Sequence, residues 1–274
     1  MAGREETESV TKKKDPSMTS KKSLERLRQA GVPDGGNCLY CHNNNDDELK
    51  VGRLLKDRAS GITIHHYCLL FASGLSQRGR GRQGIEGFLP DDIIQEFRRA
   101  KRLACRYCTN RGATIGCVVK RCPMTFHFHC GLANGSLSQF FGNFNSYCLE
   151  HRPHQETDLS CGSPSKIECP ICFCDVPCET NLNVLKTPCC NSTWLHRECV
   201  QRQAISSGYF FRCPVCNNKK EFEVEMKMFG IYIPEQDASW EREDGAYQEL
   251  LERHNECNAD KCLCPDGRFF CKGK

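Results

Sequence analysis

The hydrophobic positions of the chain fall into short stretches that predict small elements. Ile93, Ile94, Phe97 and Ala100 recur at helical spacing, so they predict an amphipathic helix that Asp91 caps. Its opposite face is strongly basic. The helix leads the chain directly into a cysteine-rich segment.

Two further elements are predicted near the C-terminal end. Phe222, Val224, Met226 and Met228 alternate with charged residues, which indicates a short, half-buried strand. A helix with one apolar side is expected over residues 244–254. We expect this segment, residues 219–256, to brace the module that precedes it.

The N-terminal segment shows no apolar periodicity. Residues 1–34 are rich in Lys, Ser, Thr and Glu, so we expect a disordered basic tail. Basic runs at residues 12–14 and 21–22 suggest a nuclear localisation signal, although such runs are also common on solvated tails. The segment has no secretory h-region, and no apolar run reaches about 18 residues, so no membrane partner is expected.

Charge is unevenly distributed although the net charge is only +4. The end of the chain is acid-rich, and arginines crowd the middle. This basic band could meet nucleic acid or an acidic histone surface, or it could simply be a solvated face. The basic band consists of Arg78, Arg80, Arg82, Arg98, Arg99, Lys101, Arg102, Arg106 and Arg111.

Twenty-three cysteines give the strongest chemical signal. Most fall into Cys-x2-Cys and His-x2-Cys pairs, at the spacing with which neighbouring ligands bind one zinc ion. A disulfide framework is the alternative, but it needs an oxidising compartment. The odd cysteine count and the histidines at ligand positions favour zinc. Low apolar content and clustered cysteines then predict small α+β modules, each stabilised by metal.

The first pairs define a zinc knuckle at residues 35–80. Cys38 and Cys41 form one pair, and His65 and Cys68 form the other. His66 is a rival to His65, but only His65 keeps the two-residue gap. Residues 81–104 then supply a mobile, Gly-rich basic loop and the predicted helix, which we expect to couple the knuckle rigidly to the next module.

The second module, residues 105–154, contains four consecutive pairs. Pairs one and three are expected to bind one ion, and pairs two and four another, in an interleaved cross-brace. The first site then comprises Cys105, Cys108, His127 and Cys130. The second comprises Cys117, Cys122, Cys148 and His151. Two spare histidines, His129 and His154, are expected to face solvent.

A linker at residues 155–166 precedes a third module at residues 167–218. One site is expected from Cys169, Cys172, His196 and Cys199. Cys213 and Cys216 need two more ligands, for which Cys189 and Cys190 are the nearest candidates and Cys174 and Cys178 the alternatives. About five zinc ions are therefore expected in total. This ligand order is closer to a PHD or variant RING than to the usual RING.

Aromatic side chains are expected to fill the small cores. Trp194 is assigned to the core of the third module. The core of the second module is expected to contain Phe126, Phe128, Phe140, Phe141 and Phe144.

Longer motifs then resemble a known family. GIEGFLPDDIIQEFRRAKRLACRYCTNRGATIGC, CPMTFHFHC and YCLEH resemble an extended PHD finger and are similar to the family of PHD finger protein 7, whose close relatives are the G2/M-phase-specific ubiquitin ligase and the fly protein pineapple eye. The resemblance continues through TPCCNSTWLHRECVQ, FFRCPVCNN, GIYIPEQDASW and AYQELLERHNEC, and it covers residues 34–270. It implies an extended PHD finger followed by a RING-like or PHD-like finger, nuclear location and ubiquitin ligase activity toward chromatin.

A RING performs no covalent chemistry. It docks a ubiquitin-charged conjugating enzyme and orients the thioester. In RING relatives an apolar shelf beside the zinc sites provides the docking surface, and Ile171, Pro214 and Val215 stand at those positions. We also expect Tyr209, Phe210 and Phe211 to add to it. The basic residue that often follows the last RING ligand is replaced by Asn217. Because the chain ends at Lys274, no thioester-forming domain is expected.

We therefore expect a nuclear RING-type ubiquitin ligase whose partners are a charged conjugating enzyme and a histone or nucleosome. A non-catalytic chromatin reader is the alternative, and it would need an aromatic cage for methyl-lysine, for example around Tyr107 and Phe126. Direct DNA binding is a third hypothesis that rests on the basic band. Residues 257–274, with Cys257, Cys262, Cys264 and Cys271, form a truncated or degenerate Cys-rich tail.

Overall fold

The computed structural model describes residues 25, 27–31, 36–80, 83–155, 167–177, 182–190, 193–246, 259–265 and 267–268. Within these ranges the helices are α2 (Glu48–Val51), α3 (His66–Leu70), α4 (Pro90–Ala100), α5 (Phe128–Ala133), α6 (Arg197–Ser207) and α7 (Lys220–Met228). None of them is long and apolar enough to cross a membrane.

The described strands form five small antiparallel hairpins. They pair β1 (Leu54–Asp57) with β2 (Ile62–His65), β3 (Ile115–Gly116) with β4 (Thr125–Phe126), β5 (Leu137–Ser138) with β6 (Ser146–Tyr147), β7 (Ile167–Glu168) with β8 (Asp175–Val176), and β9 (Val184–Lys186) with β10 (Trp194–His196). Such short hairpins bury little apolar surface and are marginally stable on their own. Metal binding supplies the missing stability in small α+β modules of this kind.

The knuckle and the second module share one hydrophobic cluster, and we call residues 27–151 the N-terminal body. Phe71 from the end of α3 stacks on Phe128 of α5 with ring centroids 5.4 Å apart. The hydroxyl of Tyr40, in the knuckle, donates to the carbonyl of Ile93 in α4 at 3.1 Å. A shared hydrophobic core therefore supports the predicted rigid coupling between these two modules.

Helix α4 carries the predicted apolar face but begins two residues earlier than predicted. Pro90 occupies its first turn and Leu89 precedes it, so Asp91 lies inside the first turn rather than at the cap. Proline at the start and acidic residues in the first turn both favour this end of a helix. Ile93 and Ala100 are fully buried.

The disordered tail was predicted to extend to residue 34, but residues 27–31 are described and contribute to the core. Leu27 and Ala30 are buried in the cluster of the N-terminal body. The ammonium group of Lys101 donates to the carbonyl of Ala30 at 2.8 Å. The sequence shows no apolar periodicity here because a single helical turn, with only Leu27 and Ala30 buried, is too short to show one.

The loop before α4 is also more fixed than predicted over its described part. The amide of Gly79 donates to the carbonyl of Gly87 at 2.8 Å, and Ile85 and Phe88 are buried. Glu86 accepts from Arg53 at 2.8 Å. These contacts attach the loop to the knuckle.

The strand predicted over residues 222–228 is wrong, because this segment is helix α7. Phe222 and Met226, one turn apart, are fully buried, whereas Val224 is 59% exposed. Asn218 precedes the helix and exchanges two hydrogen bonds of 3.1 Å with Glu221 in the first turn. Its side-chain nitrogen donates to the Glu221 carboxylate, and its side-chain oxygen accepts from the Glu221 amide. Glu and Lys have high helix propensity. The alternation of apolar and charged residues hid the fact that Phe222 and Met226 are four residues apart and so lie on one face of a helix. The helix predicted over 244–254 lies mostly outside the described residues.

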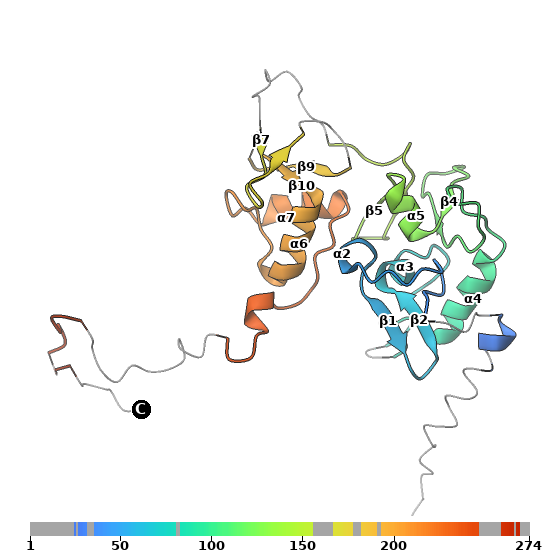
Figure 1. Cartoon of the computed structure of the whole chain (residues 1–274), viewed down its shortest axis with the longest axis horizontal. Coiled ribbons are helices and arrows are strands. Elements are labelled where there is room, and N and C mark those ends of the chain that lie inside the picture. The colour runs from blue at the N-terminus through green and yellow to red at the C-terminus, as the bar shows by residue number, and fades with distance from the viewer. Residues whose placement is uncertain are drawn as a thin grey trace, which may run out of the picture.

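After α7 the chain returns to the N-terminal body. The ring of Tyr232 packs against those of His66, Tyr67 and Phe140 at 5.5, 5.3 and 5.2 Å. Gln139 donates to the carbonyl of Met228 at 3.0 Å. Figure 1 shows α6, α7, β9 and β10 gathered on one side of the molecule, with α2 and β5 facing them from the N-terminal body. The segment after α7 therefore braces the third module against that body.

Candidate metal centres and partner surface

Twenty cysteine and histidine side chains gather into five groups of four. In each group the sulfur and nitrogen atoms lie within 4.8 Å of one another. The groups are Cys38, Cys41, His65 and Cys68; Cys105, Cys108, His127 and Cys130; Cys117, Cys122, Cys148 and His151; Cys169, Cys172, His196 and Cys199; and Cys189, Cys190, Cys213 and Cys216. The first four groups unite the pairs that the spacing predicted.

The uncertain positions of the third module are placed by this geometry. The sulfurs of Cys189 and Cys216 are 3.4 Å apart, and those of Cys190 and Cys213 are 4.0 Å apart. Cys174 stays outside the groups, and its thiol donates to the carbonyl of Cys172 at 3.5 Å. The other alternative, Cys178, lies outside the described residues. Adjacent cysteines can therefore reach one common centre here.

Four Cys-x2-Cys turns have one backbone geometry. In each, the amide of the first cysteine donates to the carbonyl five residues later, and the amide four residues later donates back. The residue after the second cysteine is left-handed, with φ between 59° and 63°. These residues are His42, Thr109, Phe173 and Asn217. The closed turn holds two sulfurs side by side, which explains why the x2 spacing suits one ion.

Three His-x2-Cys pairs also share one geometry. His65, His127 and His196 each end or follow a strand and occupy the N-cap of the next helix, α3, α5 or α6. The cysteine three residues later is then in the first helical turn. This strand-to-helix corner points both side chains to the same place, toward a Cys-x2-Cys turn.

The donor atoms fit zinc. A tetrahedral ion with bonds of about 2.3 Å to sulfur and about 2.0 Å to nitrogen separates its ligand atoms by about 3.5 to 3.8 Å. The Nδ1 atoms of His127 and His196 lie 3.4 and 3.3 Å from the sulfurs of Cys108 and Cys172. The sulfurs of Cys122 and Cys148 are 3.9 Å apart.

The second nitrogen of three histidines is held by the backbone. Nε2 of His65, His127 and His196 lies 2.5, 3.3 and 3.1 Å from the carbonyl oxygens of Asn45, Arg111 and Asp175. An Nε2–H that donates to a carbonyl leaves Nδ1 free as the metal ligand, which is the arrangement that orients histidine in metal sites. The chain thus binds zinc through fingers of this kind, and the number of ions stays a prediction.

Two histidine predictions have different outcomes. His66, the rival of His65, points away from the metal group and its Nε2 lies 3.1 Å from the Glu86 carboxylate. His129 was predicted to face solvent, which is wrong. Its ring stacks on His127 at 5.9 Å, and its Nδ1 is buried without a hydrogen-bond partner. His154 is exposed, as predicted.

Two aromatic predictions for the N-terminal body need correction. Phe141 and Phe144 are 40% and 37% exposed, so they are not core residues. Phe126 is only 1% exposed and packs against Tyr107 at 5.8 Å, which leaves no open cage around that pair. Trp194 is buried in β10, as predicted.

The predicted docking residues lie at the two Cys-x2-Cys turns of the third module. Ile171 and Pro214 are partly exposed, and Val215 is 49% exposed. Tyr209 and Phe210 are also exposed, but Phe211 is buried against Phe222 and does not belong to this surface. Ile171, Pro214, Val215, Tyr209 and Phe210 therefore provide exposed apolar surface in the third module.

A cleft of about 840 Å³ lies between the N-terminal body and the third module. Residues of α2, α5 and α6 line it, together with half-buried His129 and exposed Glu198 and Arg202. Its mixed apolar and polar walls could accept a short peptide segment.

Comparison with known proteins supports these assignments. The family described as PHD-like zinc-binding domain matches residues 65–152. The chain is 44% identical over 234 residues to a human G2/M phase-specific E3 ubiquitin-protein ligase, covering 85% of this chain and 33% of that protein. The chicken protein of that name is 46% identical over 237 residues, 86% of this chain and 32% of its own.

A fly protein is similar over the same length. Drosophila melanogaster Pineapple eye protein is 35% identical over 235 residues, which cover 85% of this chain and 40% of that protein. The chain therefore spans about a third of the length of the G2/M phase-specific ligases and 40% of Pineapple eye protein. The resemblance predicted from the sequence motifs is confirmed.

Proposed function

Because the chain is homologous to the G2/M phase-specific E3 ubiquitin-protein ligases and to Pineapple eye protein over most of its length, we propose that it promotes ubiquitin transfer from a charged conjugating enzyme. The observation that carries this proposal is the similarity, at 44 to 46% identity, to proteins named as E3 ubiquitin-protein ligases. The paired zinc turns of the third module supply a surface on which such an enzyme could dock.

The third module acts by orientation. Its chemistry requires no covalent intermediate on this chain, because docking restricts the thioester of the charged enzyme to reactive conformations. Ile171 comes from the first turn and Pro214 and Val215 from the last one, and the zinc ions would hold these turns at a fixed separation. The ligands therefore have a structural role, and the apolar residues between them make the contact.

The substrate is proposed to be nuclear, and a histone in a nucleosome fits the charge of the N-terminal body. Arg98, Arg102, Arg106 and Arg111 are exposed, whereas Arg99 is paired with buried Glu96 at 2.7 Å. Exposed guanidinium groups suit the acidic surface of a nucleosome or the phosphates of its DNA. The N-terminal body would then position the third module beside its target.

The test is ubiquitin transfer by the zinc-loaded protein across a panel of conjugating enzymes, with nucleosomes as substrate. Ile171→Ala should abolish transfer while zinc content stays unchanged, and Cys172→Ser should lose both. Absence of transfer with every enzyme, from protein that carries its full zinc content, would contradict the proposal.

The cleft between the two parts favours a second candidate, a chromatin reader without activity. A histone-tail segment would lie between α2, α5 and α6, against the half-buried ring of His129. Isothermal titration with methylated and unmethylated tail peptides tests this candidate, and the transfer assay separates it from the ligase. Binding with equal affinity would remove methyl-lysine reading, and no binding would remove the reader.

A further inference from the structure

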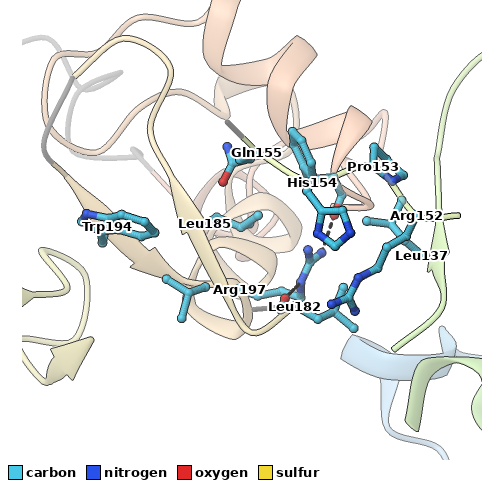
Figure 2. Close-up of a pocket in the computed structure, with 11 residues that line it drawn as sticks. Leu137, Arg152, Pro153, His154, Gln155, Leu182, Leu185, Trp194 and Arg197 are labelled. Carbon is cyan, nitrogen blue, oxygen red and sulfur yellow. Dashed lines mark hydrogen bonds between the residues drawn. The ribbon is translucent and has the colours of Figure 1, made fainter. Parts of the chain in front are cut away.

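A small pocket lies where the segment after His151 meets the third module. It is lined by Arg152, His154 and Gln155 on one side and by Leu182, Trp194 and Arg197 on the other. Figure 2 shows the side chains of Arg152, His154 and Arg197 gathered at one end, with Trp194 at the other. The pocket has a volume of about 30 Å³, and none of its described lining residues is acidic.

Gln155 fixes this junction. Its side-chain oxygen accepts from the amide of Lys186 at 2.7 Å, and its side-chain nitrogen donates to the carbonyl of Lys186 at 2.9 Å. The same nitrogen lies 2.9 Å from the Glu225 carboxylate. The amide side chain therefore pairs with the edge of β9 as a strand residue would, and the pocket has a defined wall.

Both guanidinium groups are bound only to carbonyl oxygens in the described residues. Arg152 donates from Nη1 to the carbonyl of Gly135 at 2.8 Å. Arg197 donates to the carbonyls of Leu182 and Phe229. A guanidinium has five N–H donors, so each keeps several for another acceptor.

The charges of the two arginines are not balanced within the pocket. Arginine remains protonated in proteins, so Arg152 and Arg197 each bring a positive charge to the same pocket. Arg197 is also the first residue of α6, whose N-terminal end adds positive potential. Two positive charges thus lie near a helix N-terminus, and the described lining contains no carboxylate. Both features favour the binding of an anion in this pocket.

We propose that this pocket binds a phosphate group, held by Arg152 and Arg197 with His154 as a third contact. A dianion balances two permanent positive charges, and the guanidinium fork matches the oxygens of phosphate. The volume accepts about two water-sized atoms, so two oxygens enter and the rest of the group faces solvent. The site is independent of ubiquitin transfer. Its occupant would join the N-terminal body to the third module, because Arg152 directly follows that body and bonds to its Gly135, and Arg197 belongs to the third module.

The phosphate can be free or carried by a side chain. Isothermal titration of the whole zinc-loaded protein with inorganic phosphate, and with a short phosphoserine peptide and its unphosphorylated form, distinguishes the two sources. All solutions have equal ionic strength, with chloride as the reference anion. We expect saturable binding of at least one phosphate probe and none of chloride or of the unphosphorylated peptide.

Variants locate the site. Arg152→Gln should weaken binding at least tenfold, and Arg197→Lys, which keeps the charge but loses the fork, should weaken it as well. Arg58→Gln removes an equal charge from an exposed loop of the knuckle and should change nothing. Zinc content and the unfolding midpoint show whether Arg152→Gln folds.

Tryptophan fluorescence gives a second readout. In a Trp240→Phe background Trp194 is the sole tryptophan, and it lines the pocket, so its emission should change with the same saturation curve. No saturable binding of either phosphate probe, equal binding of chloride, or an equal loss in Arg152→Gln and Arg58→Gln would each overturn the proposal.

Discussion

The knuckle and the third module use the same zinc turns but bury them differently. All four ligands of the knuckle are buried, with exposed fractions of 6% or less. In the third module each group has an exposed member, Cys172 in one and Cys216 in the other. The difference arises because α3, α4 and α5 pack over the knuckle, while the turns of the third module stand at its edge.

The apolar side chains beside the turns follow the same division. In the knuckle Leu39 and Tyr40, which lie between the first two ligands, are buried. In the third module Phe173 is 76% exposed and Val215 is 49% exposed. One region therefore uses its apolar residues to couple two fingers, and the other leaves them on the surface beside its metal centres. The comparison teaches that similar fingers can serve as scaffold or as contact surface.

The largest effect is expected from a ligand of the buried knuckle. Cys68→Ser should remove its zinc and unfold the N-terminal body, since structural zinc contributes on the order of 10 kcal/mol in small modules. Cys216→Ser should cost one ion from the third module and leave the N-terminal body folded. Zinc content with amide proton NMR spectra measures both. Equal damage to both regions by either variant would break the comparison.

A smaller effect is expected from the phenylalanines. Phe128→Ala removes a buried ring that contacts Phe71 and Tyr67, so it should cost about 3–5 kcal/mol in free energy of unfolding. Phe173→Ala removes a ring exposed to solvent and should change that energy by less than about 0.5 kcal/mol. Denaturant unfolding with zinc present measures the free energy of unfolding of both variants. Similar losses in Phe128→Ala and Phe173→Ala would show that the two rings do not differ in their contribution to stability.

The smallest effect is expected from the left-handed residue of each turn. Thr109 has φ of 63° and Asn217 has φ of 59°. A β-branched residue is disfavoured there, and asparagine is tolerated. Thr109→Asn should therefore stabilise the protein by about 0.5–1 kcal/mol, and Asn217→Thr should destabilise it by a similar amount. Shifts of the same sign in thermal unfolding would show that the two turns are not equivalent.

The metal groups were largely predictable from the sequence because each pair is local. A Cys-x2-Cys turn closes on itself, and a His-x2-Cys pair spans one strand-to-helix corner, so spacing alone gives the pairs. The interleaved order then follows from four consecutive pairs. Only the second group of the third module stayed open, because Cys189 and Cys190 are adjacent and do not have this spacing.

Contacts between distant segments could not be predicted. Gln155 pairs with β9, and Tyr232 returns to the rings of His66 and Tyr67, although no local pattern marks either residue. Arg152 and Arg197 are likewise ordinary basic residues in the sequence and meet only because the third module packs on the N-terminal body. Helix α7 was missed for a local reason, because its alternating apolar residues fit the period of a strand as well as that of a helix. Asn218, followed three residues later by Glu221, could have indicated the start of a helix.

The most direct measurement compares two exposed valines in the discharge of ubiquitin from a charged conjugating enzyme. Val215 is 49% exposed in the third module, and Val118 is 46% exposed in the N-terminal body. Val215→Ala should slow discharge about fivefold or more, a loss of about 1 kcal/mol at a docking contact, and Val118→Ala should leave it unchanged. Equal rates for the two variants and the unaltered protein would contradict the assignment of the third module as the surface that docks the conjugating enzyme.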